Sequence, residues 1–238
     1  MSSHDELLKR ISMLEHKLEV LIEHRLGVLE DVEAIERLQN MYGYYLDNLL
    51  YDPIADLFAE KDAAIEIGSR GRYHGKDNVR QFLRDVLGDG RPGLRSGQVI
   101  NHTQHQPIVT VAQDRNRAQV RCRALIQATA PPPQGAAPPP DGKTMMWAEG
   151  VYENTYVREQ GVWKIGVLWW VPTFYVSHPY TRLWFESSPA SSAFPPQTPS
   201  APPLQGLGRL FMPFHYRHPI TGEEIPPSRV VRSEAPPA

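Results

Sequence analysis

The sequence has little of several features that mark common classes of protein. It contains a single cysteine, Cys122, so an internal disulfide is impossible and a reducing compartment is expected. No apolar run is long enough to span a membrane, and the first ten residues are polar where a signal peptide would be apolar. The 25 basic residues are scattered and the net charge is −2, which gives no basis for binding nucleic acid. We therefore expect a cytoplasmic protein that binds neither a membrane nor nucleic acid.

Motifs for common kinds of chemistry are also lacking. The sequence has no phosphate-binding loop, no dinucleotide fingerprint and no nucleophile elbow. His102 and His105 are three residues apart on an expected strand, so their side chains point to opposite faces and make a poor metal chelate. We predict no metal and no cofactor, and any catalysis would be acid–base chemistry by side chains.

The central feature of the sequence is a predicted hairpin from Trp147 to Trp170. Two runs rich in aromatic and β-branched residues flank a turn at 159–161. Alternation places one set of small and aromatic residues on a single face: Ala148, Gly150, Tyr152, Asn154 and Tyr156. The second run is apolar on both faces, which predicts a bent sheet with helices on its concave side.

Two helices are predicted before the hairpin's sheet. Residues 4–26 carry leucine and isoleucine at heptad spacing, which predicts a helix with one apolar stripe. The stripe packs either on the protein's own domain or against other copies in a homo-oligomer, and the homo-oligomer is the favoured interpretation. Gly27 marks an expected break or kink, and Asp31 is a plausible N-cap for a second helix that runs to Leu49. The predicted domains are therefore an N-terminal helix, 1–27, a central domain, 28–188, and a proline-rich linker with a C-terminal arm, 189–238.

The remaining segments alternate between regular elements and loops. A strand is predicted at 63–68, a helix at 77–87, and strands at 99–111 and 117–129, with Pro107 at an edge or bulge. The glycine-rich residues 88–97 form a surface connection or a lid, and residues 130–143, with six prolines, form an extended loop. The aromatic residues of 204–225 predict an arm that packs on its own domain or on a neighbour.

Polar residues on otherwise apolar elements are the candidates for catalysis. Tyr44, Tyr45 and Asp47 lie on the second helix, and His102 lies near the start of a strand. A carboxylate that accepts a hydrogen bond from one imidazole nitrogen makes the other nitrogen a usable general base. A helix packed across a sheet can bring Asp47 and His102 together. The alternative is a solvated aspartate and a structural histidine.

These residues carry a resemblance to a known family. The helix that ends in Tyr44-Tyr45-Leu46-Asp47, the turn 72–77, Asn101-His102 and the pattern 150–165 are similar to the SnoaL-like branch of the nuclear transport factor 2 (NTF2) superfamily. The resemblance covers residues 31–180. It implies an α+β fold, a cone-shaped barrel in which a curved mixed sheet surrounds helices, with an apolar cavity open at one end.

The resemblance also implies a catalytic site. Scytalone dehydratase, hexachlorocyclohexane dehydrochlorinase and bile-acid dehydratase work without a cofactor through an Asp–His pair, which corresponds here to Asp47 and His102. Tyr44 or Tyr45 would polarise the substrate or hold a water. The dehydrochlorinase has an arginine where this chain has Val167, so assistance to a leaving group would come from another arginine. The candidates are Arg70, Arg72, Arg121 and Arg123.

A further resemblance, to lignin diarylpropane lyases that release formaldehyde, suggests an aromatic substrate. Trp147, Tyr152, Trp169 and Trp170 could line a cavity for two aromatic rings, although a packed core explains the same pattern. The predicted substrate-binding residues are Arg72, His105, Arg121, Trp147, Tyr152 and Trp169. Three functions stay open: a deformylase or dehydratase, a ketone isomerase or polyketide cyclase, and a non-catalytic binding module. Trimers are common among such relatives, so a homotrimer is favoured.

Overall fold

The structure is a computed structural model. It describes residues 3–88, 90, 92–93, 100–130, 144–178, 183–184, 190–200, 204–206, 209–211, 215 and 224. More than half of the expected loop at 88–97, nearly all of that at 130–143 and most of the C-terminal arm lie outside these residues.

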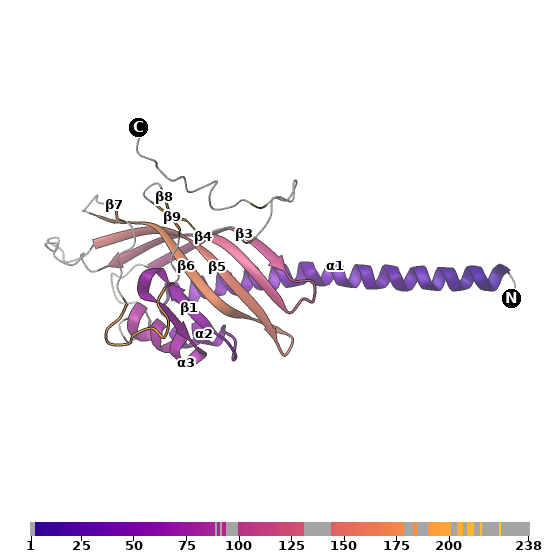
Figure 1. Ribbon diagram of the computed structural model, residues 1–238, viewed down its shortest axis with the longest axis horizontal. Coiled ribbons are helices and arrows are strands. Elements are labelled where there is room, and N and C mark those ends of the chain that lie inside the picture. Colours follow the sequence, from indigo (N-terminus) through magenta and orange to yellow (C-terminus); the bar gives the residue numbers. More distant parts are fainter. Residues whose placement is uncertain are drawn as a thin grey trace, which may run out of the picture.

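One long helix dominates the N-terminal part of the chain (Figure 1). α1 runs without interruption from Ser3 to Asp47, and its N-terminal half projects away from the rest of the protein. Shorter helical elements follow, namely α2 (Tyr51–Asp56), the 3-10 turn η1 (Gly68–Arg70), α3 (Lys76–Gln81) and the π-helical η2 (Phe82–Leu87). The helix expected at 77–87 is therefore an α-helical turn that continues as a π-helix.

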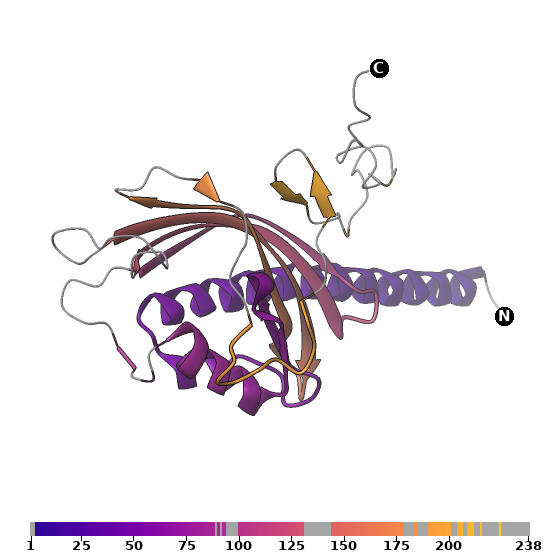
Figure 2. The same cartoon turned by 60° about the vertical axis from the view of Figure 1, so that its left-hand side comes forward.

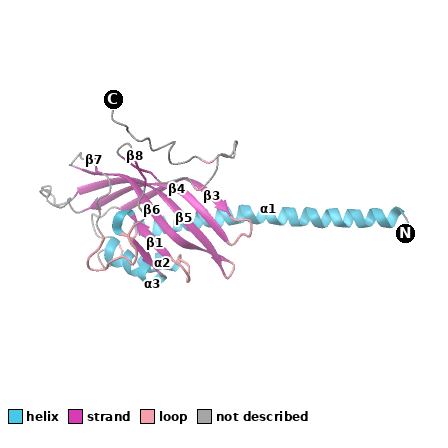
Figure 3. Ribbon diagram, viewed as in Figure 1, coloured by secondary structure: helices cyan, strands magenta, loops and turns pink. Residues whose placement is uncertain are grey.

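A curved sheet wraps around the C-terminal half of α1 and the shorter helices (Figures 1 and 3). Its strands are β1 (Ala64–Ile67), β2 (Arg72–His74), β3 (Ile100–Val111), β4 (Arg117–Ala130), β5 (Thr144–Glu159), β6 (Val162–His178) and β7 (Leu183–Trp184). The order is β2-β1-β6-β5-β4-β3, with β7 also paired to β6. β1 is parallel to β6, and the other pairs are antiparallel. The predicted α+β class is confirmed.

The concave face of the sheet holds the core, and Figure 2 shows the helices on that side. The face predicted for the first hairpin strand is buried, since all five alternating residues from Ala148 to Tyr156 are shielded from solvent. The hairpin turn has positive φ at Gln160 (51°) and Gly161 (82°), as tight two-residue turns between twisted strands require. The pairing of β5 with β6 has a bulge opposite Glu149 and Gly150, where Thr173 is the extra residue on β6. A Cβ on Gly150 would lie 2.7 Å from the Trp170 ring, so this position has room for glycine alone.

The long edge strand β3 is irregular where proline was expected to disturb it. The pairing with β4 shifts register between His105 and Ile108, and Gln106 has a φ of 53°. Because Pro107 has no N–H to donate to the ladder, a bulge at this position keeps the rest of β3 paired. The prediction of an edge or bulge at Pro107 is confirmed.

Two predictions about α1 are wrong. Gly27 neither breaks nor kinks the helix, which continues through it, and Asp31 is an interior residue of the helix rather than its N-cap. Gly27 is needed for close packing, because a Cβ there would lie 2.0 Å from the Arg115 guanidinium. Arg115 passes over the glycine and donates from Nε to Asp31 Oδ2 at 2.6 Å.

Asp31 ties the helix to the hairpin. Besides Arg115, the Arg158 guanidinium donates to its Oδ1, and Trp163 Nε1 donates to the same atom at 3.0 Å. The carboxylate is only 2 % exposed. A buried charge needs such partners, so Asp31 fixes α1 against the end of the sheet. The helix boundary predicted at residue 27 falls inside α1; the other domain boundaries stay predictions.

The segment 190–200 covers the edge strand β2. Arg72 and Thr198 exchange backbone hydrogen bonds of 2.8 and 3.3 Å, and the Tyr73 hydroxyl donates to the Phe194 carbonyl at 2.9 Å. Farther on, β8 (Leu204–Gly206) and β9 (Arg209–Phe211) form a small hairpin that contacts β6. The described residues of the C-terminal arm therefore lie on the chain's own domain.

Candidate functional site

Asp47 and His102 meet where the last residue of α1 approaches the start of β3. Oδ1 of Asp47 accepts two hydrogen bonds from His102, one from the backbone N–H and one from Nδ1, each 2.8 Å long. The Asp47 side chain is 16 % exposed and that of His102 is 10 % exposed. The backbone bond holds the aspartate in place independently of the imidazole ring.

This geometry determines the tautomer of the imidazole. An ionised carboxylate can only accept hydrogen bonds, so Nδ1 of His102 carries the proton. Nε2 then keeps its lone pair, and no described residue forms a hydrogen bond with it. A neutral imidazole in this state can take a proton from a bound molecule, with Asp47 stabilising the imidazolium that results.

Three aromatic side chains form a buried cluster, and two of them, Tyr42 and Tyr152, lie near enough to Asp47 for its charge to raise their pKa. The rings of Tyr42 and Tyr152 meet edge to face with centroids 6.0 Å apart, and those of Tyr152 and Trp170 are 6.3 Å apart. Tyr42 is completely buried, and the other two are 1 % and 2 % exposed. The Trp170 indole N–H has no hydrogen-bond partner among the described residues. The Tyr42 hydroxyl makes no well-aligned hydrogen bond there either, although the Tyr152 side chain lies close enough to lower its pKa.

Burial controls the ionisation of both interior tyrosines. It raises the pKa of Tyr42, and the nearby charge of Asp47 raises it further. Burial likewise raises the pKa of Tyr152 well above its usual value, and Asp47 is again among the contributing charges. Both phenols therefore stay protonated at neutral pH and can act as hydrogen-bond donors beside the carboxylate.

The two tyrosines predicted as catalytic lie elsewhere on α1. Tyr44 is 71 % exposed on the outside of the helix. Tyr45 is partly buried and packs against the hydrophobic core. Helix geometry explains this arrangement, because the buried face of α1 passes through Tyr42 and Leu46, which turns Tyr44 toward solvent.

The structure places Arg72 and Trp169 on the outer side of β1, β2 and β6. Nε of Arg72 donates to Glu66 at 2.8 Å, and its guanidinium lies 5.7 Å from the centre of the Trp169 ring. Glu66 is 1 % exposed, so the carboxylate of this ion pair is buried. These residues hold the sheet edge together, and the structure does not bring them to Asp47.

Arg121 also lies on the outer face of the sheet. Its Nε donates to Glu153 at 2.6 Å, and the His215 Nδ1 contacts the other oxygen of the same carboxylate. Arg123 pairs with Glu149 at 2.8 Å on this face, and Arg70 donates to the Ile67 carbonyl at 3.3 Å. The candidate arginines therefore have structural partners away from the Asp47–His102 pair, and the contact of His215 anchors the C-terminal arm.

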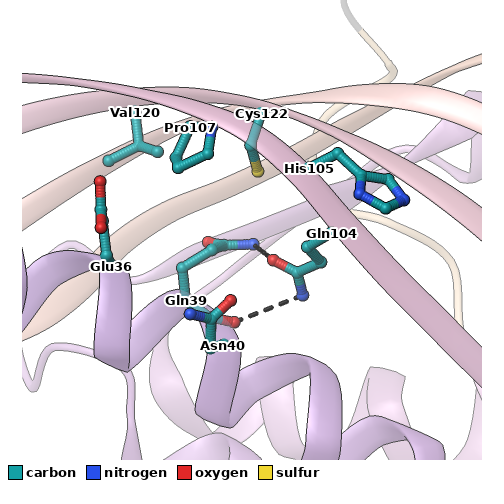
Figure 4. Close-up of a pocket in the computed structure, with 8 residues that line it drawn as sticks. All are labelled: Glu36, Gln39, Asn40, Gln104, His105, Pro107, Val120 and Cys122. Atoms are coloured by element: carbon teal, nitrogen blue, oxygen red, sulfur yellow. Dashed lines mark hydrogen bonds between the residues drawn. The ribbon is translucent and has the colours of Figure 1, made fainter.

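His105 and Trp147 are likewise separated from the pair. Trp147 is 45 % exposed on the outer face of β5. His105 lines a small recess between α1, β3 and β4 that is partly open to solvent (Figure 4). Of the predicted substrate-binding residues, Tyr152 is the one that the structure brings to the interior beside Asp47.

The recess in Figure 4 ends at a hydrogen-bonded amide pair. Nε2 of Gln39 donates to Gln104 at 2.6 Å, while Oε1 of Gln39 accepts from Asn154 at 2.8 Å and from the Tyr156 hydroxyl. These amides are engaged with one another, so the network supports the contact of α1 with the sheet.

Sequence reasoning missed Tyr42 as a site residue, and it gave Trp170 a role only as one of four aromatic residues that could line a cavity. Both occupy positions expected for core residues, and only the absence of a well-aligned hydrogen bond in the described chain distinguishes them. The available signal was weak, namely a tyrosine on the buried face of the helix that ends in Asp47.

The described part of the chain has neither a metal-binding cluster nor a membrane-spanning helix. Those residues contain no group of three or more histidine, cysteine, aspartate or glutamate side chains that could hold a metal ion. No helix within the same residues is long and apolar enough to cross a membrane.

Comparisons with known proteins agree with this fold. Among solved structures, a hexachlorocyclohexane dehydrochlorinase (LinA) type 2 is 19 % identical, with a TM-score of 0.52 over 64 % of this chain and 92 % of that chain. A second structure of LinA is 17 % identical, with a TM-score of 0.51 over the same shares. A putative scytalone dehydratase from Novosphingobium aromaticivorans is 20 % identical, with a TM-score of 0.49 over 68 % and 93 %.

The family is established by sequence. No curated protein matches the chain at a significant level. A family model described as a SnoaL-like domain matches residues 27–168, which include α1 from Gly27 onward, the Asp47–His102 pair and most of the central hairpin. Because this match covers more than half of the 238 residues, the chain belongs to the SnoaL-like family, as its α+β cone indicates.

Proposed function

We propose that this protein is a cofactor-independent lyase that uses the Asp47–His102 pair as a general base on a hydroxylated aromatic molecule. The observation that carries the proposal is the 2.8 Å bond from Nδ1 of His102 to Asp47, which leaves Nε2 without a described partner. Such a pair can remove a proton near neutral pH, and a positioned base typically contributes about 10²- to 10⁴-fold to a rate.

The aromatic interior supports an aromatic substrate. Tyr42 and Tyr152 lie near Asp47, and Trp170 extends the same aromatic cluster, against which a substrate ring could pack. The Tyr42 hydroxyl and the Trp170 N–H, which make no well-aligned hydrogen bond in the described chain, could donate to substrate oxygens. A buried donor without such a bond calls for an explanation, and a ligand would supply one.

A phenolic diarylpropane diol is the substrate that best uses these groups. Loss of the benzylic hydroxyl as water, with ionisation of the para-phenol, gives a quinone methide that can accept electrons. His102 then takes the proton from the terminal hydroxyl, the carbon–carbon bond breaks, and formaldehyde leaves while the electron pair forms the stilbene double bond and restores the phenolate. The buried donors would stabilise that phenolate.

Two related functions would use the same residues. Simple dehydration stops at the loss of water and needs the pair to remove a carbon-bound proton. Isomerisation or cyclisation of a ketone needs the pair to move a proton between carbons. A non-catalytic binding module would use the aromatic interior alone, and Asp47 would then serve only to anchor β3.

The test is turnover by the purified protein with a phenolic 1,2-diarylpropane-1,3-diol. Formaldehyde is measured by a colorimetric assay, and the stilbene is measured by its ultraviolet absorbance. We expect both products in equal amounts from the wild type, and at least a hundredfold loss of rate in Asp47→Asn and His102→Gln.

Matched controls separate the loss of the catalytic pair from a general effect of replacing an aspartate or a histidine. Asp77→Asn changes an almost fully exposed aspartate, and His16→Gln changes an exposed histidine on the projecting helix; both should retain full activity. A folded wild type that releases neither product would refute the deformylase. Activity that survives in both pair variants would refute the assignment of the base.

A further inference from the structure

The face of α1 that ends at Asp47 meets β3 at successive turns of the helix. Gln39, Gly43 and Asp47 are four residues apart, which places them on one side of α1. His102 and Gln104 are alternate residues and share one side of β3. Gln39 donates to Gln104 at 2.6 Å, and two turns later Asp47 accepts from His102 at 2.8 Å. Two pairs of side chains therefore connect the same face of the helix to the same face of the strand.

Gly43 allows the strand to approach the helix between these two pairs. It is buried, and a Cβ at this position would lie 2.5 Å from Nε2 of Gln104 and 3.7 Å from the carbonyl oxygen of His102. A methyl group here would therefore displace the Gln104 amide and leave the backbone of His102 at an ordinary contact distance. Because glycine is unfavourable inside a helix, the close approach of this amide accounts for its presence.

β5 fixes the orientation of the Gln39 amide, which is 3 % exposed. Its Oε1 accepts from Asn154 at 2.8 Å and also from the Tyr156 hydroxyl. Since these donors occupy the oxygen, Nε2 faces β3 and donates to Gln104 (Figure 4). Nε2 of Gln104 donates in return to the Gln39 carbonyl at 3.3 Å. The two amides form a reciprocal pair whose position is set from the middle of the sheet.

β3 depends on such a contact because it is the last strand in the order of the described sheet. It pairs with β4, and its register shifts directly after His105. A strand held along one edge and interrupted by a bulge can slide relative to a helix that crosses it. Gln104 lies beside this bulge and two residues from His102, which is about 7 Å along a strand. The amide pair therefore restrains β3 close to the imidazole.

We propose that Gln39 and Gln104 are positioning residues for the base. Their amide pair holds β3 where the ring of His102 meets Asp47, and Gly43 provides the space for it. Misplacing a reacting group by about 1 Å can lower a rate about 10²-fold, so a restraint of this kind matters for turnover. The effect on turnover rests on the proposed function, whereas the effect on the imidazole does not.

The first test follows the Nδ1 proton of His102 by NMR in full-length protein labelled with nitrogen-15. Gln104→Met keeps the length of the side chain and removes both amide hydrogen bonds. We expect the Nδ1 proton to exchange with water about tenfold faster in this variant, the factor that the loss of one or two hydrogen bonds implies. The amide proton of Tyr152 on β5 should keep its wild-type rate, because a general loss of stability would accelerate both protons.

The second readout is turnover of the phenolic diarylpropane diol. In Gln104→Met, kcat should fall about tenfold while KM stays within about twofold, because the base is displaced and the aromatic cluster is untouched. Gln119→Met makes the same change at an exposed position of β4 and should alter neither kcat nor the exchange of the Nδ1 proton. The recess beside the amide pair is partly open to solvent, so water can satisfy Gln39 and the fold should persist.

Gly43→Ala tests the same contact from the helix. The added methyl group displaces the Gln104 amide, so the Nδ1 proton of His102 should again exchange faster, although alanine favours the helix. In a Gln104→Ala background the methyl group meets no amide, and Gly43→Ala should then have no further effect on exchange. Independent, additive effects of the two substitutions would overturn the role assigned to Gly43.

Unchanged exchange of the Nδ1 proton in Gln104→Met, with native near-ultraviolet circular dichroism, would overturn the proposal whether or not the wild type releases formaldehyde. If Gln104→Met does not fold, Gly43→Ala gives the same decision. Faster exchange in the variants of a wild type without turnover would refute the lyase and support the positioning role.

Discussion

Nδ1 of His102 lies 2.8 Å from Oδ1 of Asp47, although 55 residues separate them in the sequence. The same oxygen accepts the backbone N–H of His102, so the end of α1 and the start of β3 are fixed to each other. This double contact separates the structural role of Asp47 from its effect on the imidazole, and variants can test the two roles individually.

Asp47→Asn should preserve the fold and remove the charge that assists the base. The asparagine oxygen in place of Oδ1 can still accept from both the backbone N–H and Nδ1–H of His102, so the tautomer is kept, but the neutral amide no longer stabilises an imidazolium. We expect nearly unchanged thermal unfolding and a loss of activity of about 10²- to 10⁴-fold. Nitrogen-15 NMR of labelled histidine should show Nδ1–H in both proteins. Activity that survives in the variant would contradict the role of the Asp47 charge.

Tyr42→Phe should weaken substrate binding without weakening the fold. Its hydroxyl is buried and makes no well-aligned hydrogen bond in the described chain, so removing it relieves a poorly paired polar group; we expect stability that is unchanged or higher by about 1 kcal/mol. If the hydroxyl donates to the substrate, kcat/KM falls about tenfold.

Tyr156→Phe is the matched control for Tyr42. That hydroxyl donates to Gln39 in the buried amide network, so its removal should lower the free energy of unfolding by about 1 kcal/mol. Urea unfolding of the two variants distinguishes them. Equal destabilisation would mean that Tyr42 also has an internal partner.

Asp31→Ala should strongly destabilise the domain. It leaves the Arg115 and Arg158 guanidiniums and the Trp163 N–H without their common acceptor, and breaking such a buried ion pair typically lowers the free energy of unfolding by about 3 kcal/mol or more. Glu30→Ala, the same loss of charge at the exposed neighbouring position, should have little effect on urea unfolding. Similar midpoints for the two variants would contradict the anchoring role.

Cys122 should be unreactive in the folded protein. Burial raises the pKa of its thiol to about 12, so the nucleophilic thiolate is scarce at pH 8. In the unfolded chain the Cys122 thiol loses its proton near pH 9, whereas in the folded chain it keeps the proton until about pH 12. The contribution of this thiol to the free energy of unfolding therefore falls as the pH rises from 9 toward 12. A thiol reagent at pH 8 should label the protein only after urea is added. Rapid labelling of native protein would contradict the burial of this strand.

Periodicity determined much of the fold. The alternation from Ala148 to Tyr156 identifies the buried face of β5, and the glycine at the end of the hairpin turn identifies the reversal. Pro107 predicted an irregular edge strand for a local reason, its missing N–H. Such inferences succeed because neighbouring residues decide which side of an element faces the core.

Periodicity failed where a distant side chain decided the local structure. Gly27 and Asp31 have the residue types of a helix break and a cap, yet Arg115, more than 80 residues later, passes over the glycine and pairs with the aspartate, so the helix continues. Residue type also could not show which groups bond the arginines and Trp169. Their partners Glu66, Glu153 and Asn154 lie on other strands, where local sequence gives no indication of them.

For the candidate site, the sequence by itself supplied Asp47 and His102 as polar residues on apolar elements and a resemblance that pairs them. Only the tertiary structure decided that they touch, that Tyr44 faces solvent, and that the buried Tyr42 lies near Asp47. The physical reason is that hydrogen-bond geometry and burial depend on how α1 crosses the curved sheet. The sequence specifies the faces of those elements, and their packing sets the distances between them.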